Sequence, residues 1–307
     1  MPLDTFAHER PASSAGLFEL APAKINLALH VVGQRADGYH LLESLVTFAD
    51  MGDELSFCLA DEDSLMVSGP FAPALSVGVE VDNLVLRARD LLRDCLLKSS
   101  QPAPPVAIHL EKNLPVAAGI GGGSADAAAT LRGLLRLWQA EIAEAELLAL
   151  ALKLGADVPM CLKGEALMAT GIGEDITPLP ELPSLALVLG NPLVGVATPD
   201  IFRRLATKDN APIGQIAAKD WMPLLKTLRN DLEPPARSLV REIDQISNMI
   251  GGEGALLTRM SGSGATCFGI FPSADMAQTA AANLCGQKPD WYFQAVQTVG
   301  RKSGETS

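Results

Sequence analysis

Apolar residues recur along the chain with two different periods, and the period changes several times between its start and its end. From Leu17 the stretch LFELAPAKINLALHVVG alternates and is rich in Leu, Ile and Val, which predicts strands interrupted at Pro22. An apolar run over 41–48 and the segments MGDELSFCLA and DSLMVSG continue this strand-and-turn pattern. Residues 1–16 are polar and contain proline and glycine, so they predict a mobile N-terminal extension.

Helical spacing begins near Asn83, in NLVLRARDLLRDCLL. PVAIHLEKNLP predicts a strand, and helices are expected after the glycine-rich segment that follows it and over 144–154. ALMATGIGEDITPL predicts a strand and a turn. The second half opens with a strand, LALVLG, and NPLVGVATPDIFRRL predicts a loop entering a helix. A helix near 238–250, a glycine-rich turn, a last helix and a last strand complete it.

Strands therefore alternate with helices in both halves, without the regular rhythm of a barrel. This pattern predicts an α+β protein of two domains. The proline-rich PLPELP is the expected boundary, with one domain over 17–182 and the other over 183–307.

The charge balance excludes two classes of partner. The chain has 24 Lys and Arg against 36 Asp and Glu, a net charge of −12, which repels nucleic acid and anionic membranes alike. No apolar run reaches the roughly 18 residues that a membrane span needs. The five cysteines are scattered without a CxxC pair, which argues against a disulfide framework or a structural zinc site and favours the cytoplasm.

The segment LPVAAGIGGGSADAAATL places four glycines before a serine and an alanine-rich helix. It is not a P-loop, because no lysine follows the glycines, and Ser124 stands where a dinucleotide fingerprint has its third glycine. Glycines let backbone N–H groups converge, and a helix N-terminus attracts anions. The segment predicts a phosphate site, with Ser124 either capping the helix or offering its hydroxyl to a phosphate or metal. A tightly packed helix start is the structural alternative.

PVAAGIGGGSADAAA resembles the phosphate loop of the GHMP kinases, the superfamily of galactokinase, homoserine kinase and mevalonate kinase. APAKINLALHVVGQRADGYH and RMSGSGATCFGIF match two further landmarks in the right order, so that the resemblance covers roughly 18–300. It implies an N-terminal domain like ribosomal protein S5 domain 2 and a ferredoxin-like C-terminal domain. It also implies ATP and Mg²⁺ as cofactors. The N-terminal block and GADVPM resemble most closely a branch that phosphorylates a hydroxyl of CDP-linked methylerythritol in non-mevalonate isoprenoid biosynthesis.

The resemblance implies that Asp157 is the catalytic base and that Lys24 pairs with it. From the residues alone, Asp157 is better explained as the cap of the following turn, and Lys24 is equally suited to a strand edge. The matching residues over 155–159 reverse that preference. Asn26, two residues after Lys24, is expected on the same face of the strand, in contact with the substrate.

The remaining site residues follow from the same resemblance. The phosphates of ATP are expected against Pro115, Val116, Ala117, Ala118, Gly119, Ile120, Gly121, Gly122, Gly123, Ser124 and Ala125, and its adenine and ribose beside Asn83, Leu84 and Lys112. The cytidine pocket is expected at Tyr39, His40, Thr198 and Phe202. A surface hairpin at DGYH and a core position for Phe202 are the structural alternatives. The second glycine turn, over 261–265, is expected to support the substrate's phosphates or the active-site loops.

Two other functions remain open at this point. One is another small-molecule GHMP kinase, of the mevalonate, homoserine or galactose type, against which RADGYH argues. The other is a nucleotide-binding regulator without catalysis, which the presence of Lys24 and Asp157 disfavours. The small-molecule kinase is expected to be a monomer or a homodimer, and the sequence identifies no metal ligands.

Overall fold

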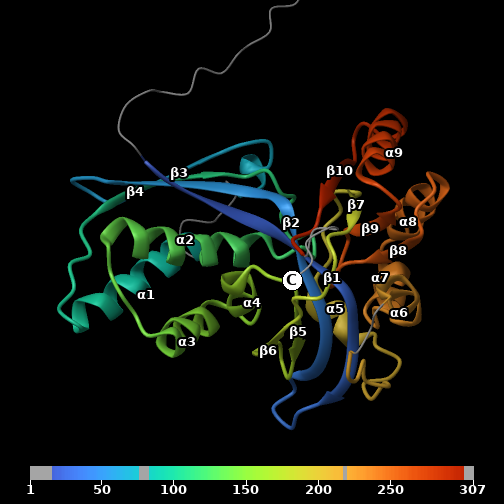
Figure 1. The fold of residues 1–307 in the computed structure, drawn as a ribbon, viewed down its shortest axis with the longest axis horizontal. Coiled ribbons are helices and arrows are strands. Elements are labelled where there is room, and N and C mark those ends of the chain that lie inside the picture. The colour runs from blue at the N-terminus through green and yellow to red at the C-terminus, as the bar shows by residue number, and fades with distance from the viewer. Residues whose placement is uncertain (1–15, 76–82, 217–219, 301–307) are drawn as a thin grey trace, which may run out of the picture.

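The computed structural model describes residues 16–75, 83–216 and 220–300 (Figure 1). Of the predicted N-terminal extension, only Gly16 falls within this part of the chain. In the described residues of the N-terminal half, six strands form one sheet with the order β3-β4-β2-β5-β6, and β1 also pairs with β2. These strands are β1 (Leu17–Gln34), β2 (His40–Leu59), β3 (Ser64–Ser68), β4 (Val106–Glu111), β5 (Leu167–Thr170) and β6 (Asp175–Pro178).

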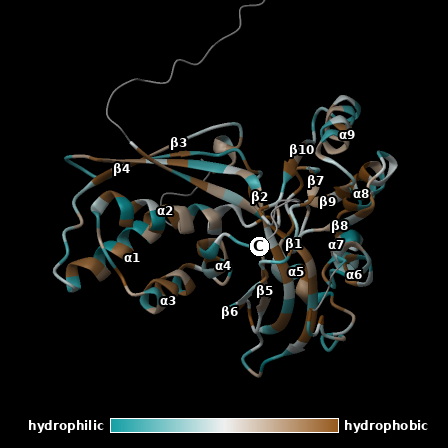
Figure 2. Ribbon diagram, in the orientation of Figure 1, coloured by the Kyte–Doolittle hydropathy of each residue, from teal (hydrophilic) through white to brown (hydrophobic). Residues whose placement is uncertain are grey.

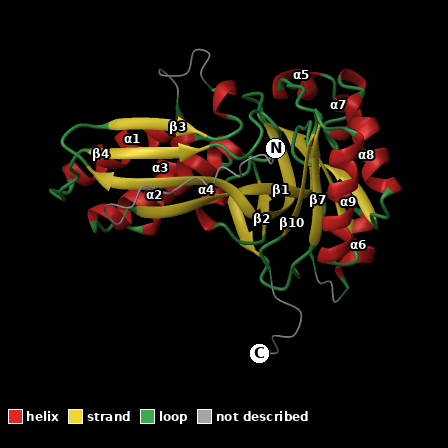
Figure 3. Ribbon diagram, turned by 90° about the horizontal axis from the view of Figure 1, so that it is seen from above, coloured by secondary structure: helices red, strands yellow, loops and turns green. Residues whose placement is uncertain are grey.

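Helices cover one face of this sheet (Figures 1 and 3). They are α1 (Leu84–Lys98), α2 (Gly122–Trp138), α3 (Glu144–Leu154) and α4 (Val158–Lys163), and a short 3₁₀ turn, η1 (Ala72–Ala74), precedes them. α2 packs directly on β1 and β2. Its buried residues are continuous over 125–131, so this part of the helix is covered on all sides, and Leu134 and Trp138 extend the buried face toward its end.

The C-terminal half contains a second, antiparallel sheet. Among the described residues its strands are β7 (Ala186–Asn191), β8 (Leu257–Met260), β9 (Cys267–Phe271) and β10 (Tyr292–Gln297). The order β10-β7-β9-β8 places the fourth strand beside the first, as in a ferredoxin-like fold. α8 (Glu242–Gly252) and α9 (Ala274–Gln287) both pack on it and touch each other. The shorter helices are α5 (Thr198–Arg203), α6 (Trp221–Thr227) and α7 (Glu233–Leu239).

The predicted interruption at Pro22 is wrong, because β1 continues through it as one strand. The ladder with β2 shifts register at three places, first between Pro22 and Lys24 and next between Asn26 and Ala28. A bulge accommodates a proline, which has no N–H to donate. It also turns backbone donors away from the partner strand: the N–H of Lys24 donates to Ile120 O at 2.9 Å, and that of Asn26 to Ser261 Oγ at 3.0 Å.

The two halves share a hydrophobic core. One buried cluster joins Ile25 and Leu27 of β1 to Leu187 of β7 and Phe268 of β9. Figure 2 shows hydrophobic residues along β1 and β2, which run from the first sheet toward the second. The expected domain boundary at 182/183 lies between β6 and β7, and Leu182 itself is buried in this cluster. The active-site loops are therefore supported by strands that contact both sheets.

The start predicted for the helix near 238–250 is wrong. The backbone at Val240 is extended and separates α7 from α8. The helices expected after Asn83 and over 144–154 are confirmed as α1 and α3. α4 and α6 were not expected, since each is too short to show a period. No helix in the described ranges is both long and apolar enough to cross a bilayer.

Candidate active site

The glycine-rich segment connects β4 to α2 and turns sharply just before the helix. Gly119 and Gly121 both have positive φ, of 75° and 66°, which glycine adopts without strain. Gly121 is the N-cap residue of α2. Ser124 is the third residue of that helix, so the expectation that it caps the helix is wrong. The first N–H groups of α2 are thus left for an anion, as the composition of the segment suggests.

This segment, residues 114–124, is the one expected to bind phosphate and is called the phosphate loop below; it lies directly on Lys24. A Cβ added to Gly121 would be 3.1 Å from Lys24 Cβ and 3.3 Å from its Cε, closer than most side-chain contacts. The backbone N–H of Lys24 also donates to Ile120 O, which keeps the loop against β1. The position therefore requires glycine for two reasons, its φ and the lysine beneath it.

Lys24 and Asp157 form an ion pair, with 2.6 Å between Nζ and Oδ2. The lysine side chain is 5% exposed and the aspartate side chain is 41% exposed, so the pair joins the interior to the surface. Asp157 occupies the N-cap position of α4, but its side chain makes no capping hydrogen bond. The capping role that the residues alone favoured is therefore wrong, and the carboxylate faces Lys24 instead.

The second glycine turn packs against the phosphate loop by backbone contact. A Cβ on Gly119 would be 2.6 Å from the nitrogen of Gly264, and one on Gly262 would be 2.6 Å from the oxygen of Gly119. Thr266 N–H donates to Ala118 O at 3.1 Å, and Ser261 Oγ donates to Gly119 O at 3.2 Å. Side chains would push these two turns apart, which explains the glycines on both.

A hollow of about 190 Å³ opens beside the N-terminus of α2. Its lining includes eight of the residues expected to bind ATP: Asn83, Leu84, Lys112, Pro115, Val116, Ala117, Gly122 and Gly123. Ala118, Ile120 and Ala125 are instead buried in the hydrophobic cores. Asn83 also caps α1, since its Oδ1 accepts the N–H of Val85 at 2.9 Å.

A buried charge cluster forms one side of the hollow. Lys112 Nζ donates to Asp53 Oδ2 and, at 2.7 Å, to Asp126 Oδ2. Asp53 Oδ1 accepts the N–H groups of Asn113 and Leu114, which fixes the start of the phosphate loop. Burial raises the pKa of Asp126 to about 7, against the opposing effect of Lys112. Neither aspartate was predicted from the sequence, although a carboxylate within the alanine-rich face of α2 is a visible signal.

The residues expected at the cytidine pocket come from both halves. The ring of His40, at the start of β2, stacks on Phe202 of α5 with 4.5 Å between centroids and 26° between planes. Thr198 Oγ1 lies 2.8 Å from Ser263 Oγ of the second glycine turn. Tyr39 is 61% exposed and does not share the stack. Asn26 donates to Ser44 Oγ at 2.7 Å, and its own Oδ1 is buried without a hydrogen-bond partner.

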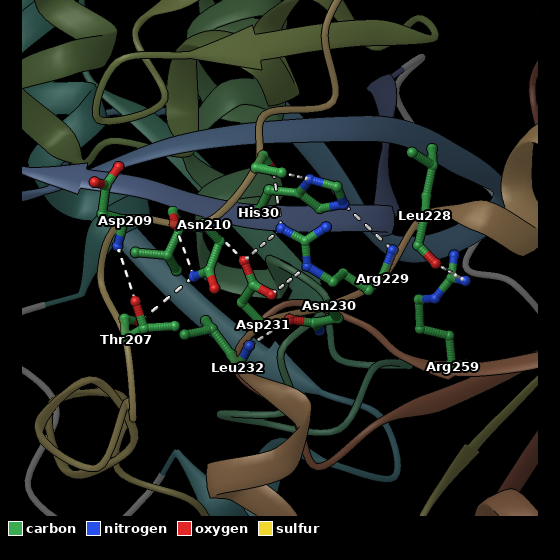
Figure 4. Close-up of polar contacts among 12 residues, drawn as sticks. His30, Thr207, Asp209, Asn210, Leu228, Arg229, Asn230, Asp231, Leu232 and Arg259 are labelled. Atoms are coloured by element: carbon green, nitrogen blue, oxygen red, sulfur yellow. Dashed lines mark hydrogen bonds and ion pairs between the residues drawn. The ribbon is translucent and has the colours of Figure 1, made fainter.

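Residues on the chain between α5 and α7 are hydrogen-bonded to β1, in part through His30 (Figure 4). The backbone N–H of Arg229 donates to His30 Nε2 at 3.3 Å, so Nδ1 carries the proton and donates to Ala211 O at 3.0 Å. Asp231 accepts the N–H of Val31 at 2.8 Å and Arg229 Nε at 2.6 Å. This network was not predicted from the sequence, because its members are far apart in the chain.

Arg259 of β8 makes a second attachment to β1, and Figure 4 shows its contact with Leu228. Its guanidinium, in a residue only 5% exposed, donates to the backbone carbonyls of Leu27, Leu225 and Leu228. Burial lowers the pKa of Arg259 from its ordinary value. β1 is thus held by the C-terminal half at Leu27, Leu29 and Val31, the residues that follow Lys24.

Family comparisons agree with this geometry. Residues 83–165 match the GHMP kinases N terminal domain, and residues 205–290 match the GHMP kinases C terminal domain. The two glycine turns and the fold they join therefore define a GHMP kinase, and the resemblance noted in the sequence is confirmed.

Individual relatives narrow the class further. A 4-diphosphocytidyl-2-C-methyl-D-erythritol kinase of Agrobacterium fabrum is 61% identical over 92% of this chain and 96% of its own length. One of Sinorhizobium medicae is 57% identical over 96% of this chain and 100% of its own. A crystal structure of 4-(cytidine 5'-diphospho)-2C-methyl-D-erythritol kinase has 34% identity and a TM-score of 0.77, covering 93% of this chain and 100% of that one. The chain belongs to the family of 4-diphosphocytidyl-2-C-methyl-D-erythritol kinases.

Proposed function

We propose that this enzyme transfers a phosphoryl group from ATP to a hydroxyl of 4-(cytidine 5'-diphospho)-2-C-methyl-D-erythritol, in non-mevalonate isoprenoid precursor biosynthesis. The observation that carries the proposal is the Lys24–Asp157 ion pair directly beneath the phosphate loop. A carboxylate and an ammonium group beside a phosphate site are what transfer to an alcohol requires. The high identity to relatives named for this reaction supports the same conclusion.

In the proposed reaction, the substrate hydroxyl lies against the exposed side of Asp157, which accepts its proton as the oxygen attacks the γ-phosphorus. Lys24 holds the carboxylate in place at 2.6 Å and, from under Gly121, neutralises charge on the transferred group. The N–H groups at the start of α2 bind the phosphates of ATP. The nucleoside of ATP occupies the hollow lined by Asn83 and Lys112.

Magnesium is proposed as the partner of the ATP phosphates. The described residues contain no group of three or more His, Cys, Asp or Glu side chains that could hold a metal ion. Mg²⁺ needs no such group of side chains, because it usually binds through substrate phosphates and waters with one or two protein ligands. The hydroxyl of Ser124, in the first turn of α2, is the proposed protein ligand. Bound there, the ion would offset phosphate charge.

The cytidine is proposed to lie at His40, Phe202, Thr198 and Tyr39, with Asn26 contacting the methylerythritol end. The stacked pair of His40 and Phe202 shows that aromatic rings from β2 and α5 can meet. The unpartnered Asn26 Oδ1 leaves an acceptor for a substrate hydroxyl. The protein is further proposed to be a cytoplasmic monomer or homodimer, and its five free cysteines suit a reducing compartment.

A coupled assay for ADP release tests the proposal. The CDP-linked alcohol should be turned over, while free mevalonate and homoserine should not. Asp157→Asn should lower kcat by about 10²–10⁴-fold while ATP still binds, because it keeps the shape and removes the proton acceptor. Asp175→Asn, at an exposed position in β6, is the matched control and should keep kcat. An Asp157→Asn enzyme within a few-fold of the parent would exclude Asp157 as the base.

A further inference from the structure

Asp126 has a buried carboxylate oxygen with no hydrogen-bond partner. The residue is 4% exposed, and its Oδ2 is taken by Lys112 at 2.7 Å. Its Oδ1 is buried and accepts nothing from the protein. A buried acceptor left unpaired costs about 1–3 kcal/mol, so such an atom is unusual away from a ligand site.

This oxygen belongs to a side chain that lines the nucleotide hollow. Asp126 follows Gly122 by four residues on α2, so the two share one face of the helix. A Cβ on Gly122 would lie 3.6 Å from Lys112 Nζ, which places the charge cluster below the first turn of α2. Among the described residues around the hollow, Lys112 and Asp126 are the charged ones, and most of the others are apolar.

The charge of Asp126 determines which part of the nucleotide it can contact. Phosphates bound at the N-terminus of α2 would be repelled by a carboxylate, so the matching group must be neutral. It must also be a hydrogen-bond donor, because an ionised carboxylate only accepts. Two neutral donors exist on ATP, the amino group of adenine and the hydroxyls of ribose.

We propose that Asp126 is a specificity-determining residue whose Oδ1 accepts a hydrogen bond from a nucleoside donor of ATP. The proposal rests on the proposed function, which puts ATP in this hollow. Asp53, on the other side of Lys112, has no such role, since both of its oxygens are occupied by Lys112, Asn113 and Leu114. The two aspartates therefore differ in one respect: Asp126, which lines the hollow, has an oxygen without a hydrogen-bond partner, and Asp53 does not.

The substitution Asp126→Asn gives a directional test. Lys112 Nζ donates to Oδ2 of Asp126, so it holds the amide oxygen of the variant at that place and turns the NH₂ to the place of Oδ1. An acceptor becomes a donor with little change in volume. Affinities and kcat/KM for ATP, ITP, 2′-deoxy-ATP and 3′-deoxy-ATP should be measured by calorimetry and kinetics. Since burial raises the pKa of Asp126 to about 7, the assays belong at a pH above 8, where the carboxyl is ionised.

The parent should prefer ATP by about ten-fold or more over the analogue that lacks the contacted donor, the effect of one hydrogen bond to a charged group. Loss of preference against ITP identifies the amino group, and loss against a deoxy analogue identifies that hydroxyl. In Asp126→Asn the same preference should fall to near one or reverse. The control Asp53→Asn should keep the parent's ratio, with melting curves recorded for each variant.

Two results would overturn the proposal. One is a parent that binds all four nucleotides alike, which needs no variant and so does not depend on folding. The other is a folded Asp126→Asn, or Asp126→Ser in its place, that keeps the parent's ratios. A parent that binds no nucleoside triphosphate at all would refute the proposed function instead, so the two failures are distinguishable.

Discussion

Gly119 joins the two glycine turns, and Gly119→Ala should separate them. The added Cβ would be 2.6 Å from the nitrogen and 2.7 Å from the oxygen of Gly264, and 2.7 Å from the oxygen of Ser261. All three are backbone atoms, so no side-chain rotation relieves the contact. The φ of 75° adds a second penalty, because an alanine in the left-handed region costs about 1–2 kcal/mol.

The overpacking itself costs about 1–3 kcal/mol, which gives a total loss of roughly 2–5 kcal/mol. Thermal unfolding should show it as a drop in Tm of at least ~3 °C, at about 1.5 °C per kcal/mol for a chain of 307 residues. The KM for ATP should rise as well, because the phosphate loop must move. Gly123→Ala is the matched control for stability: it lies inside α2, and its Cβ would meet only Leu84 Cδ1, at an ordinary 3.5 Å.

The control should be neutral or stabilised by up to about 1 kcal/mol, since alanine favours a helix. A Gly119→Ala protein that melts within about 1 °C of the parent would refute the reasoning. It would mean that the two turns separate at no cost and that their contact does not hold the site.

Two other expectations concern the substrate side and pH. Phe202→Ala removes the ring stacked on His40. Because stacking on a base is worth about 1–3 kcal/mol, KM for the CDP-linked alcohol should rise about ten-fold while KM for ATP stays unchanged. A rise in KM for ATP instead would place Phe202 at the other substrate. Burial lowers the pKa of His30 below 6.5, so the unfolded chain takes up a proton at a higher pH than the folded one, and this part of the stability is lost as pH falls below about 6.5. His30→Gln should therefore lose less Tm than the parent between about pH 7.5 and 5.5, and equal losses would contradict this assignment.

Local patterns predicted much of the fold. The helix after Asn83, the strand LALVLG and the last helix and strand have clear periods and caps, and the structure contains them. Pro22 misled the analysis, because a bulge that tolerates proline depends on which loops receive the freed backbone donors. No local pattern indicates that Ile120 and Ser261 would be those partners.

The candidate site, too, contains residues that the sequence predicted and residues that it did not. Lys24 and Asp157 were expected to pair from the family resemblance, and they lie 2.6 Å apart. Asp53 and Asp126 were missed, because what ties these buried carboxylates together is their common ion-pair partner, Lys112, which is distant from Asp53 in the chain. Such clusters are properties of tertiary structure, and a sequence shows their members only as isolated polar residues in apolar surroundings.

The attachment of Arg259 to β1 has a consequence for how the enzyme closes around its substrates. Swinging the halves apart would strip the Leu27 carbonyl from a buried guanidinium and expose the shared core of Ile25, Leu187 and Phe268. A hinge between rigid lobes is therefore too costly at this junction. Closure around the substrates therefore has to come from smaller movements that leave these contacts in place. The distance between the two halves that bind the substrates is then fixed when the chain folds.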